Sequence, residues 1–98
     1  MLNYLLDVGL SPEEIYDINH SLNEDIIGLL ELSKNKSIEV IEYYKAIGIT
    51  NLTGLIINRP DLVLINKAEA ISQSNKIETE LFVDLINNNI EDLIIFGV

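Results

Sequence analysis

Apolar residues recur along the chain three or four positions apart, in short runs separated by Gly, Pro, Asn and Ser. This spacing is typical of amphipathic helices that bury one face. The stretch Lys45–Leu64 shows it most clearly, because Gly48 ends one helical pattern and Pro60 interrupts the next. Thr50 or Asn51 can cap that second helix. The pattern predicts short helices joined by tight turns.

The same reasoning predicts helices along the whole chain, each between two breaking residues. They are expected over residues 2–8, 12–19, 22–32, 37–46, 52–59, 66–72, 77–86 and 90–96. We therefore expect an all-α fold, either an irregular bundle of short helices or a right-handed α-solenoid-like repeat. A run of 98 residues with 48% apolar content is predicted to form one domain, residues 1–98, with its own core.

Capping boxes mark two of these helix starts. In such a box, a serine hydroxyl accepts a backbone N–H, and a glutamate three residues later reaches back to the serine N–H. Ser11 with Glu14 forms the first box, and Ser21 with Glu24 the second. Ser37 is the predicted cap of the following helix, since the four residues before it resemble a loop.

Apolar positions on one side of each helix predict the core. The side chains expected to be buried are Ile15, Ile18, Leu22, Ile26, Leu29, Leu30, Val40, Ile41, Tyr44, Ile47, Leu52, Leu55, Ile56, Leu81, Phe82, Leu85 and Ile86. The helix over 37–46 is apolar on a wide arc and is expected to be central. The last run, Leu93–Val98, is apolar as well, so the domain, a second copy or a partner must cover it.

The charge of −10 is unevenly distributed. Residues 1–33 carry seven acids and no Lys or Arg, residues 34–76 carry all six cations with four acids, and residues 77–98 carry five acids. Acidic segments repel nucleic acid and anionic membranes and attract basic proteins, although charge also keeps an apolar domain soluble. The candidate partner-binding face consists of acids in the first segment, namely Glu13, Glu14, Asp17, Glu24 and Asp25.

Little in the sequence supports catalysis, a metal or a cofactor, and we expect none of them. His20 is the only histidine, and the predicted helix start at Ser21 separates it from Glu24. The chain has no cysteine, and its five glycines do not form a phosphate-binding loop. The first residues carry neither a basic n-region nor an apolar span, so a soluble cytoplasmic protein without a membrane segment is expected.

The chain also contains a weak internal repeat. Placing Gly9 over Gly48 pairs Ser11 with Thr50 and Ile18 with Ile57, and Gly97 resembles a third beginning. This pattern predicts two degenerate helical repeats, over about 1–47 and 48–98.

Gly48–Ile49, Leu55–Ile57 and Arg59–Leu62 together resemble the repeat of the mitochondrial transcription termination factor (mTERF) family. In that repeat, a Gly-hydrophobic turn precedes a short helix and a Pro-x-Leu begins another. The resemblance implies stacked helical repeats and nucleic-acid binding on a basic face. Four cations of the central segment are the candidates for such contacts, namely Lys45, Arg59, Lys67 and Lys76.

Three hypotheses about function follow. The first is a non-enzymatic acidic module that binds another protein through a helical surface, or forms a homodimer. The second is a small acidic inhibitor, of the immunity-protein or nucleic-acid-mimic kind, that occupies a basic site on its partner. The third is mTERF-like nucleic-acid binding through the central basic segment, which the acidic flanks disfavour.

Overall fold

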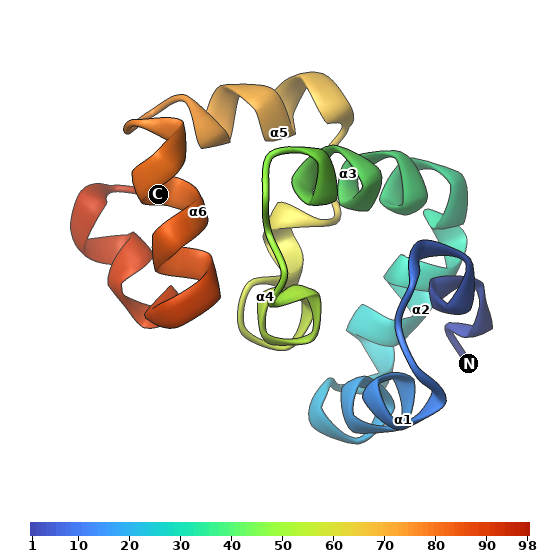
Figure 1. The fold of residues 1–98 in the computed structure, drawn as a ribbon. Helices are drawn as coiled ribbons and strands as arrows, with labels where there is room; N and C mark the ends of the chain where they lie inside the picture. Colours follow the sequence, from blue (N-terminus) through green and yellow to red (C-terminus); the bar gives the residue numbers. More distant parts are fainter.

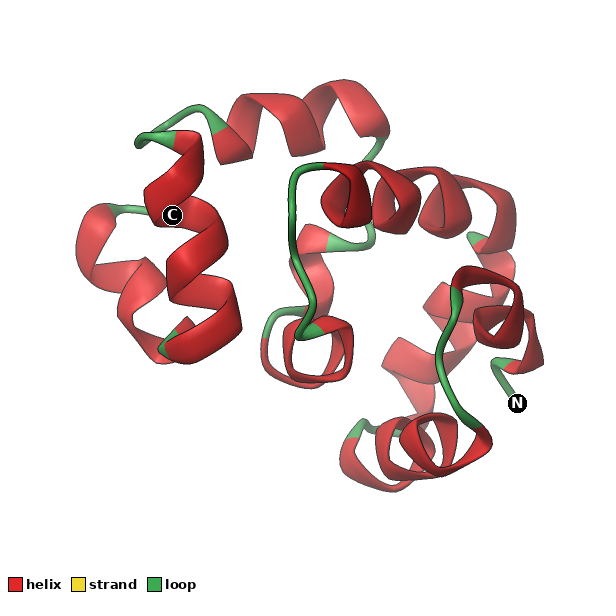
Figure 2. Cartoon of the chain, viewed as in Figure 1, coloured by secondary structure: helices red, strands yellow, loops and turns green.

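Helices alone make up the protein's regular structure, as Figure 1 and Figure 2 show. The computed structural model describes residues 1–98 and contains six α-helices, three 3-10 helices and no strand, which confirms the all-α class. In chain order the elements are η1 (Asn3–Val8), α1 (Pro12–Ser21), α2 (Glu24–Leu32), α3 (Lys34–Ala46), α4 (Leu52–Asn58), η2 (Pro60–Leu62), α5 (Lys67–Ser74), α6 (Thr79–Asn88) and η3 (Ile90–Phe96).

These helices form an irregular bundle around one core. Helix α3 packs against η1 and α5, α1 packs against α4, and η3 packs against both α6 and α4. Figure 1 shows α1 near one end of the molecule and α6 with η3 at the other. The radius of gyration, 12.5 Å, agrees with the value of about 12.6 Å expected for a compact chain of this length. Because α1 and η3 lie at opposite ends of the molecule, they offer separate surfaces.

Helix α3 is central, as predicted. Val40, Ile41 and Tyr44 are fully buried, and the Tyr44 hydroxyl donates to the Leu62 carbonyl oxygen at 2.6 Å. The Tyr44 ring lies 6.2 Å from the ring of Phe82 on α6. The ring pair of Tyr44 and Phe82 thus joins α3 to the C-terminal half of the bundle. The Tyr44 hydroxyl fixes the turn after α4.

Several predicted caps are confirmed. The Ser11 hydroxyl accepts the Glu14 N–H at 3.1 Å, and the Glu14 carboxylate accepts the Ser11 N–H at 2.9 Å. Asn51, one of the two candidates, caps α4 by accepting the Gly54 N–H at 3.1 Å. Asn66, predicted as the first residue of its helix, is instead the cap of α5, in a capping box with Glu69 that was not predicted. The predictions at Ser11 and Asn51 succeed because each cap involves groups only three residues apart.

Two predicted starts are wrong. Ser21 belongs to the last turn of α1, and Asn23 caps α2 instead by accepting the Ile26 N–H at 2.9 Å. Ser37 does not cap α3 either, because the helix begins at Lys34 and continues through the run predicted to be a loop. Ser37 is fully buried inside the helix. The Ser37 N–H donates to the Ser33 carbonyl oxygen at 2.8 Å, so the backbone bonds of the helix continue through this run while the Lys34, Asn35 and Lys36 side chains stay exposed.

The buried face of α2 also differs from the prediction. Ile27 and Leu30 are buried, whereas Leu29 is 50% exposed and Leu22 and Ile26 are only half-buried. Apolar residues cover a wide arc of α2, so periodicity alone does not choose which part of that arc faces inward. The Tyr4 hydroxyl donates to the Leu30 carbonyl oxygen at 2.9 Å, which joins α2 to η1.

Three helices end at a glycine in the left-handed conformation, as predicted. The φ angles of Gly9, Gly48 and Gly97 are 97°, 109° and 77°. At each end the residue after the glycine donates its N–H five residues back, in the bonds Leu10 to Leu5, Ile49 to Tyr44 and Val98 to Leu93. This is the Schellman arrangement, which satisfies the last carbonyls of a helix.

The division into two repeats stays a prediction.

No helix of the protein combines the length and the apolar character needed to cross a membrane.

Candidate protein-interaction surfaces

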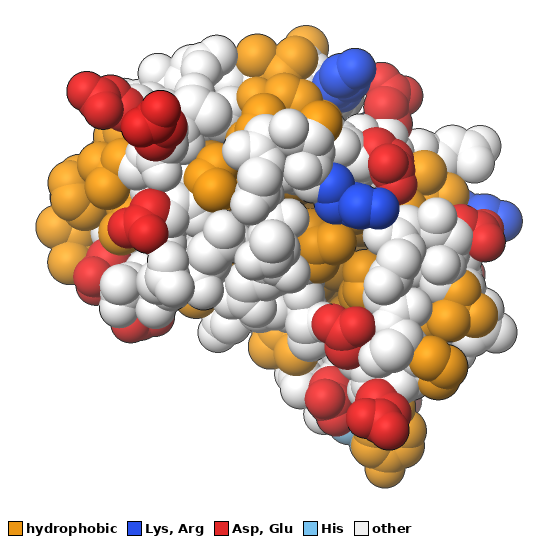
Figure 3. All heavy atoms as spheres, viewed as in Figure 1, with side chains coloured by type: hydrophobic (Ala, Val, Ile, Leu, Met, Phe, Trp, Pro, Cys, Tyr) orange, Lys and Arg blue, Asp and Glu red, His pale blue; other side chains and the backbone are white.

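The predicted acidic face lies on α1 and on the first turn of α2. Glu13, Asp17, Glu24 and Asp25 are exposed and form no ion pair. Figure 3 shows acidic side chains gathered at the lower right tip of the molecule, the end at which Figure 1 places α1. Glu24 and Asp25 also lie in the positive first turn of α2, where carboxylates are stabilising.

Glu14 has a different environment from the other four acids. Its carboxylate accepts the Thr53 hydroxyl at 2.6 Å, in addition to the Ser11 N–H at 2.9 Å. These bonds lower the pKa of the Glu14 carboxyl, and the bond from Thr53 contributes most. Glu14 therefore joins α1 to α4 and is less free than its neighbours to contact a partner.

An exposed aromatic pair lies among the acids of α1. Tyr16 is 61% exposed, and its ring stacks on that of His20 with 3.9 Å between the ring centroids. Pro12, Glu13, Tyr16 and Asp17 line a shallow hollow of about 390 Å³. We did not predict a role for Tyr16, although its spacing of four residues from His20 on one helix is a signal for such a pair.

His20 has no metal-binding environment. Its Nδ1 lies 2.8 Å from the Tyr16 carbonyl oxygen, and no three metal-ligating side chains come together anywhere in the protein.

The candidate nucleic-acid residues fall into two groups. Lys45 donates to the Val8 carbonyl oxygen at 2.9 Å, and its Nζ lies 3.6 Å from Glu42. Arg59 donates two bonds of 3.0 Å to Asp61 and one of 2.7 Å to the backbone oxygen of Val98. The other two cations are exposed: Lys67 begins α5, and Lys76 follows the end of that helix. Two of the four are thus engaged within the fold.

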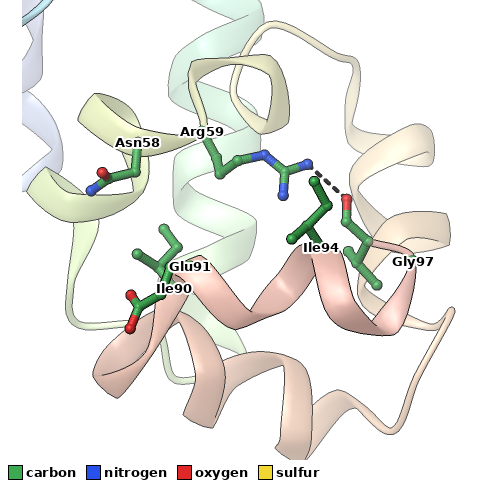
Figure 4. A pocket seen from close by; sticks show the side chains of 7 residues that line it. Asn58, Arg59, Ile90, Glu91, Ile94 and Gly97 are labelled. Atoms are coloured by element: carbon green, nitrogen blue, oxygen red, sulfur yellow. Dashed lines mark hydrogen bonds between the residues drawn. The ribbon is translucent and has the colours of Figure 1, made fainter.

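The C-terminal apolar run is not covered by the domain. Leu93 is buried, but Ile94, Ile95 and Phe96 are 77%, 74% and 47% exposed. Beside this run, α4 and η3 enclose a hollow of about 650 Å³, shown in Figure 4. Its lining residues are Asn58, Arg59, Ile90, Glu91, Ile94, Gly97 and Val98. Residues 1–98 therefore leave three apolar side chains of this run exposed.

No family model, curated protein or solved structure matches this chain. The resemblance to mTERF repeats therefore stays a prediction, and no residue takes its role from a relative.

Proposed function

We propose that this protein is a non-enzymatic interaction module whose acidic end, α1 with the start of α2, binds a basic surface of another protein. The observation that supports this proposal best is the position of Tyr16, which is exposed and shares a shallow hollow with Glu13 and Asp17. Tyrosine is enriched among residues that dominate binding energy, because it buries a large area at small entropic cost.

The charges of this end favour a basic partner. Glu13 and Asp17 lie four residues apart on α1, and both line the same hollow as Tyr16. An arginine from the partner can stack on the tyrosine ring while its guanidinium donates to a carboxylate. The acidic field also speeds the encounter with a basic protein, and salt weakens it.

The positions of His20 and Glu14 support the non-enzymatic part of the proposal. General acid–base catalysis requires a base within hydrogen-bond reach of the proton that it removes. The only histidine is stacked on Tyr16 and contacts a backbone oxygen, and Glu14 is held by Thr53 and Ser11. Neither group lies in either of the two hollows.

A nuclease-treated pull-down with the tagged protein tests the proposal. The test variant combines Glu13→Gln with Asp17→Gln, and the control, Glu39→Gln with Glu80→Gln, removes the same charge from exposed sites elsewhere. We expect a basic partner whose affinity falls at least about tenfold in the test variant and stays within about twofold in the control. Equal affinity of the two variants for that partner would refute the acidic end as its binding site.

The second candidate function is a small acidic inhibitor that occupies a basic active site. The four exposed carboxylates of α1 and α2 favour it, since they can imitate the phosphates of a nucleic acid. If the captured partner is an enzyme, the inhibitor hypothesis predicts that stoichiometric addition of this protein stops its activity. Full activity of the saturated complex contradicts the hypothesis and leaves the interaction module intact.

The mTERF-like alternative depends on Lys67 and Lys76, the two cations of the proposed set whose side chains are not engaged within the fold. It predicts a gel shift with nucleic acid at low salt that Lys67→Glu abolishes. Absence of a shift by the unmodified protein rules it out.

A further inference from the structure

The second surface lies on η3, at the end of the molecule opposite α1 (Figure 1). A 3-10 helix has about three residues per turn, so side chains three positions apart point the same way. Ile94 therefore follows Glu91 on one side of η3, and Ile95 follows Asp92 on another. Each exposed isoleucine has a carboxylate one turn before it. The surface of η3 is thus apolar and acidic at once.

The surrounding segment adds only negative charge. Residues 77–98 contain five acids and no Lys or Arg. Three of them, Glu78, Glu80 and Asp84, are exposed on or just before α6, against which η3 packs. Figure 3 shows apolar side chains at the left edge of the molecule with acidic side chains above and below them. An occupant of this surface must therefore present apolar and positively charged groups together.

The hollow between α4 and η3 continues this apolar surface, because Ile94 belongs to both. Ile90, Ile94 and Val98 form its apolar wall. In Figure 4 the Arg59 side chain extends along η3, while Asn58 and Glu91 lie toward the other end of the hollow. Asp61 neutralises Arg59 through two bonds of 3.0 Å, whereas Glu91 forms no ion pair. The hollow therefore favours an apolar side chain next to a cation.

A second copy of this chain fits this surface poorly through either of its acidic ends. Residues 1–33 carry seven acids and no Lys or Arg, and residues 77–98 carry five acids. Pairing η3 with η3, or η3 with the α1 end, brings carboxylates against carboxylates, which is unfavourable at an interface. A heterologous partner of opposite charge avoids this repulsion.

We propose that η3 and the adjoining hollow bind a basic amphipathic helix of another protein. An apolar side chain of that helix enters the hollow between Ile90, Ile94 and Val98, and the next apolar positions cover Ile95. Its Lys and Arg side chains pair with Glu91 and Asp92. This is the helix-in-groove mode of recognition, with anchors at helical spacing. It is independent of the acidic α1 end.

Fluorescence anisotropy with a labelled synthetic peptide tests this proposal. The probe is a helix of about 18 residues with Leu at helical spacing and Lys elsewhere, and the control peptide has the same composition in scrambled order. We expect the amphipathic peptide to bind and the scrambled peptide not to bind. Ile94→Asp and Ile95→Asp are each expected to weaken it about tenfold to hundredfold, since each removes a buried apolar contact. Both residues are exposed, so the variants should keep their fold, which circular dichroism checks.

Matched variants locate the site. Leu32→Asp adds the same charge at an apolar residue that is 86% exposed on α2, and it should leave peptide affinity within about twofold. The pair Glu13→Gln and Asp17→Gln should also leave it unchanged. The proposal is overturned if the scrambled peptide binds equally, if neither peptide binds, or if Leu32→Asp or the α1 pair weakens binding as much as Ile95→Asp. A dimer by light scattering that Ile95→Asp dissociates also overturns it, because a second copy then covers the surface.

Discussion

Replacing Tyr44 with Phe removes one hydroxyl from the centre of the protein. The Tyr44 side chain is fully buried, and its hydroxyl donates to the Leu62 carbonyl oxygen at 2.6 Å. Without it, a carbonyl next to the core loses its side-chain donor, which costs about 1–3 kcal/mol. For a domain of this size, about 2 kcal/mol lowers the melting temperature by roughly 8–16 °C. The same bond fixes the turn that carries Arg59 and Asp61, beside the hollow at η3.

The neighbouring tyrosine supplies the control. The Tyr43 hydroxyl lies 2.6 Å from the Ser74 hydroxyl, but this tyrosine is only partly buried. Tyr43→Phe should therefore cost about 0.5–1.5 kcal/mol, since the buried Ser74 hydroxyl keeps its bond to the Ile71 carbonyl oxygen at 2.9 Å. Urea unfolding followed by circular dichroism measures both free energies of unfolding. Equal losses in the two variants, or a loss below about 0.5 kcal/mol for Tyr44→Phe, would refute the reasoning.

The pH dependence of stability gives a second readout. Burial holds the pKa of Tyr44 above its usual value of 10.0. The stability linked to this group is therefore complete below about pH 10 and is lost as pH rises further, because the unfolded chain then releases the proton first. Tyr44→Phe should reduce this alkaline loss. Tyr4, whose pKa burial also raises, should keep part of it.

Three further predictions concern other parts of the protein. Hydrogen bonds lower the pKa of the Glu14 carboxyl below its ordinary value of 4.5. The stability that these bonds contribute is therefore present above pH 4.5 and is lost as the pH falls through the lowered pKa. Thr53→Val should make the urea midpoint less dependent on acid pH. Gly48→Ala should lower the free energy of unfolding in urea by about 1–2 kcal/mol, because Gly48 has φ +109° and Val83 lies 3.5 Å from an added Cβ. Gly28→Ala, in open space within α2, should raise that free energy by about 0.5–1 kcal/mol. Amides of η3 should exchange with deuterium faster than those of α6, since 3-10 hydrogen bonds are weaker and three of its apolar side chains are exposed; equal protection contradicts this.

The sequence by itself determined the elements that depend on neighbouring residues. The Ser11 capping box, the cap at Asn51 and the left-handed glycines were all predictable, because each satisfies backbone groups within five residues. The all-α class and the central place of α3 also followed from apolar spacing. The charge layout needed no structure, and it predicted the acidic end.

Only the tertiary structure decided between local signals of similar strength. Ser21 and Asn23 both can cap a helix, and the folded chain uses Asn23. An apolar segment such as α2 has several faces to bury, and contact with η1 chooses the one with Ile27 and Leu30.

The same limit applies to the candidate sites. Apolar spacing does not reveal that Leu93 is covered while Ile94 and Ile95 are exposed, or that Glu14 contacts Thr53 on another helix. Exposure and long-range hydrogen bonds depend on which elements meet in space, and that arrangement is a property of the whole packed chain.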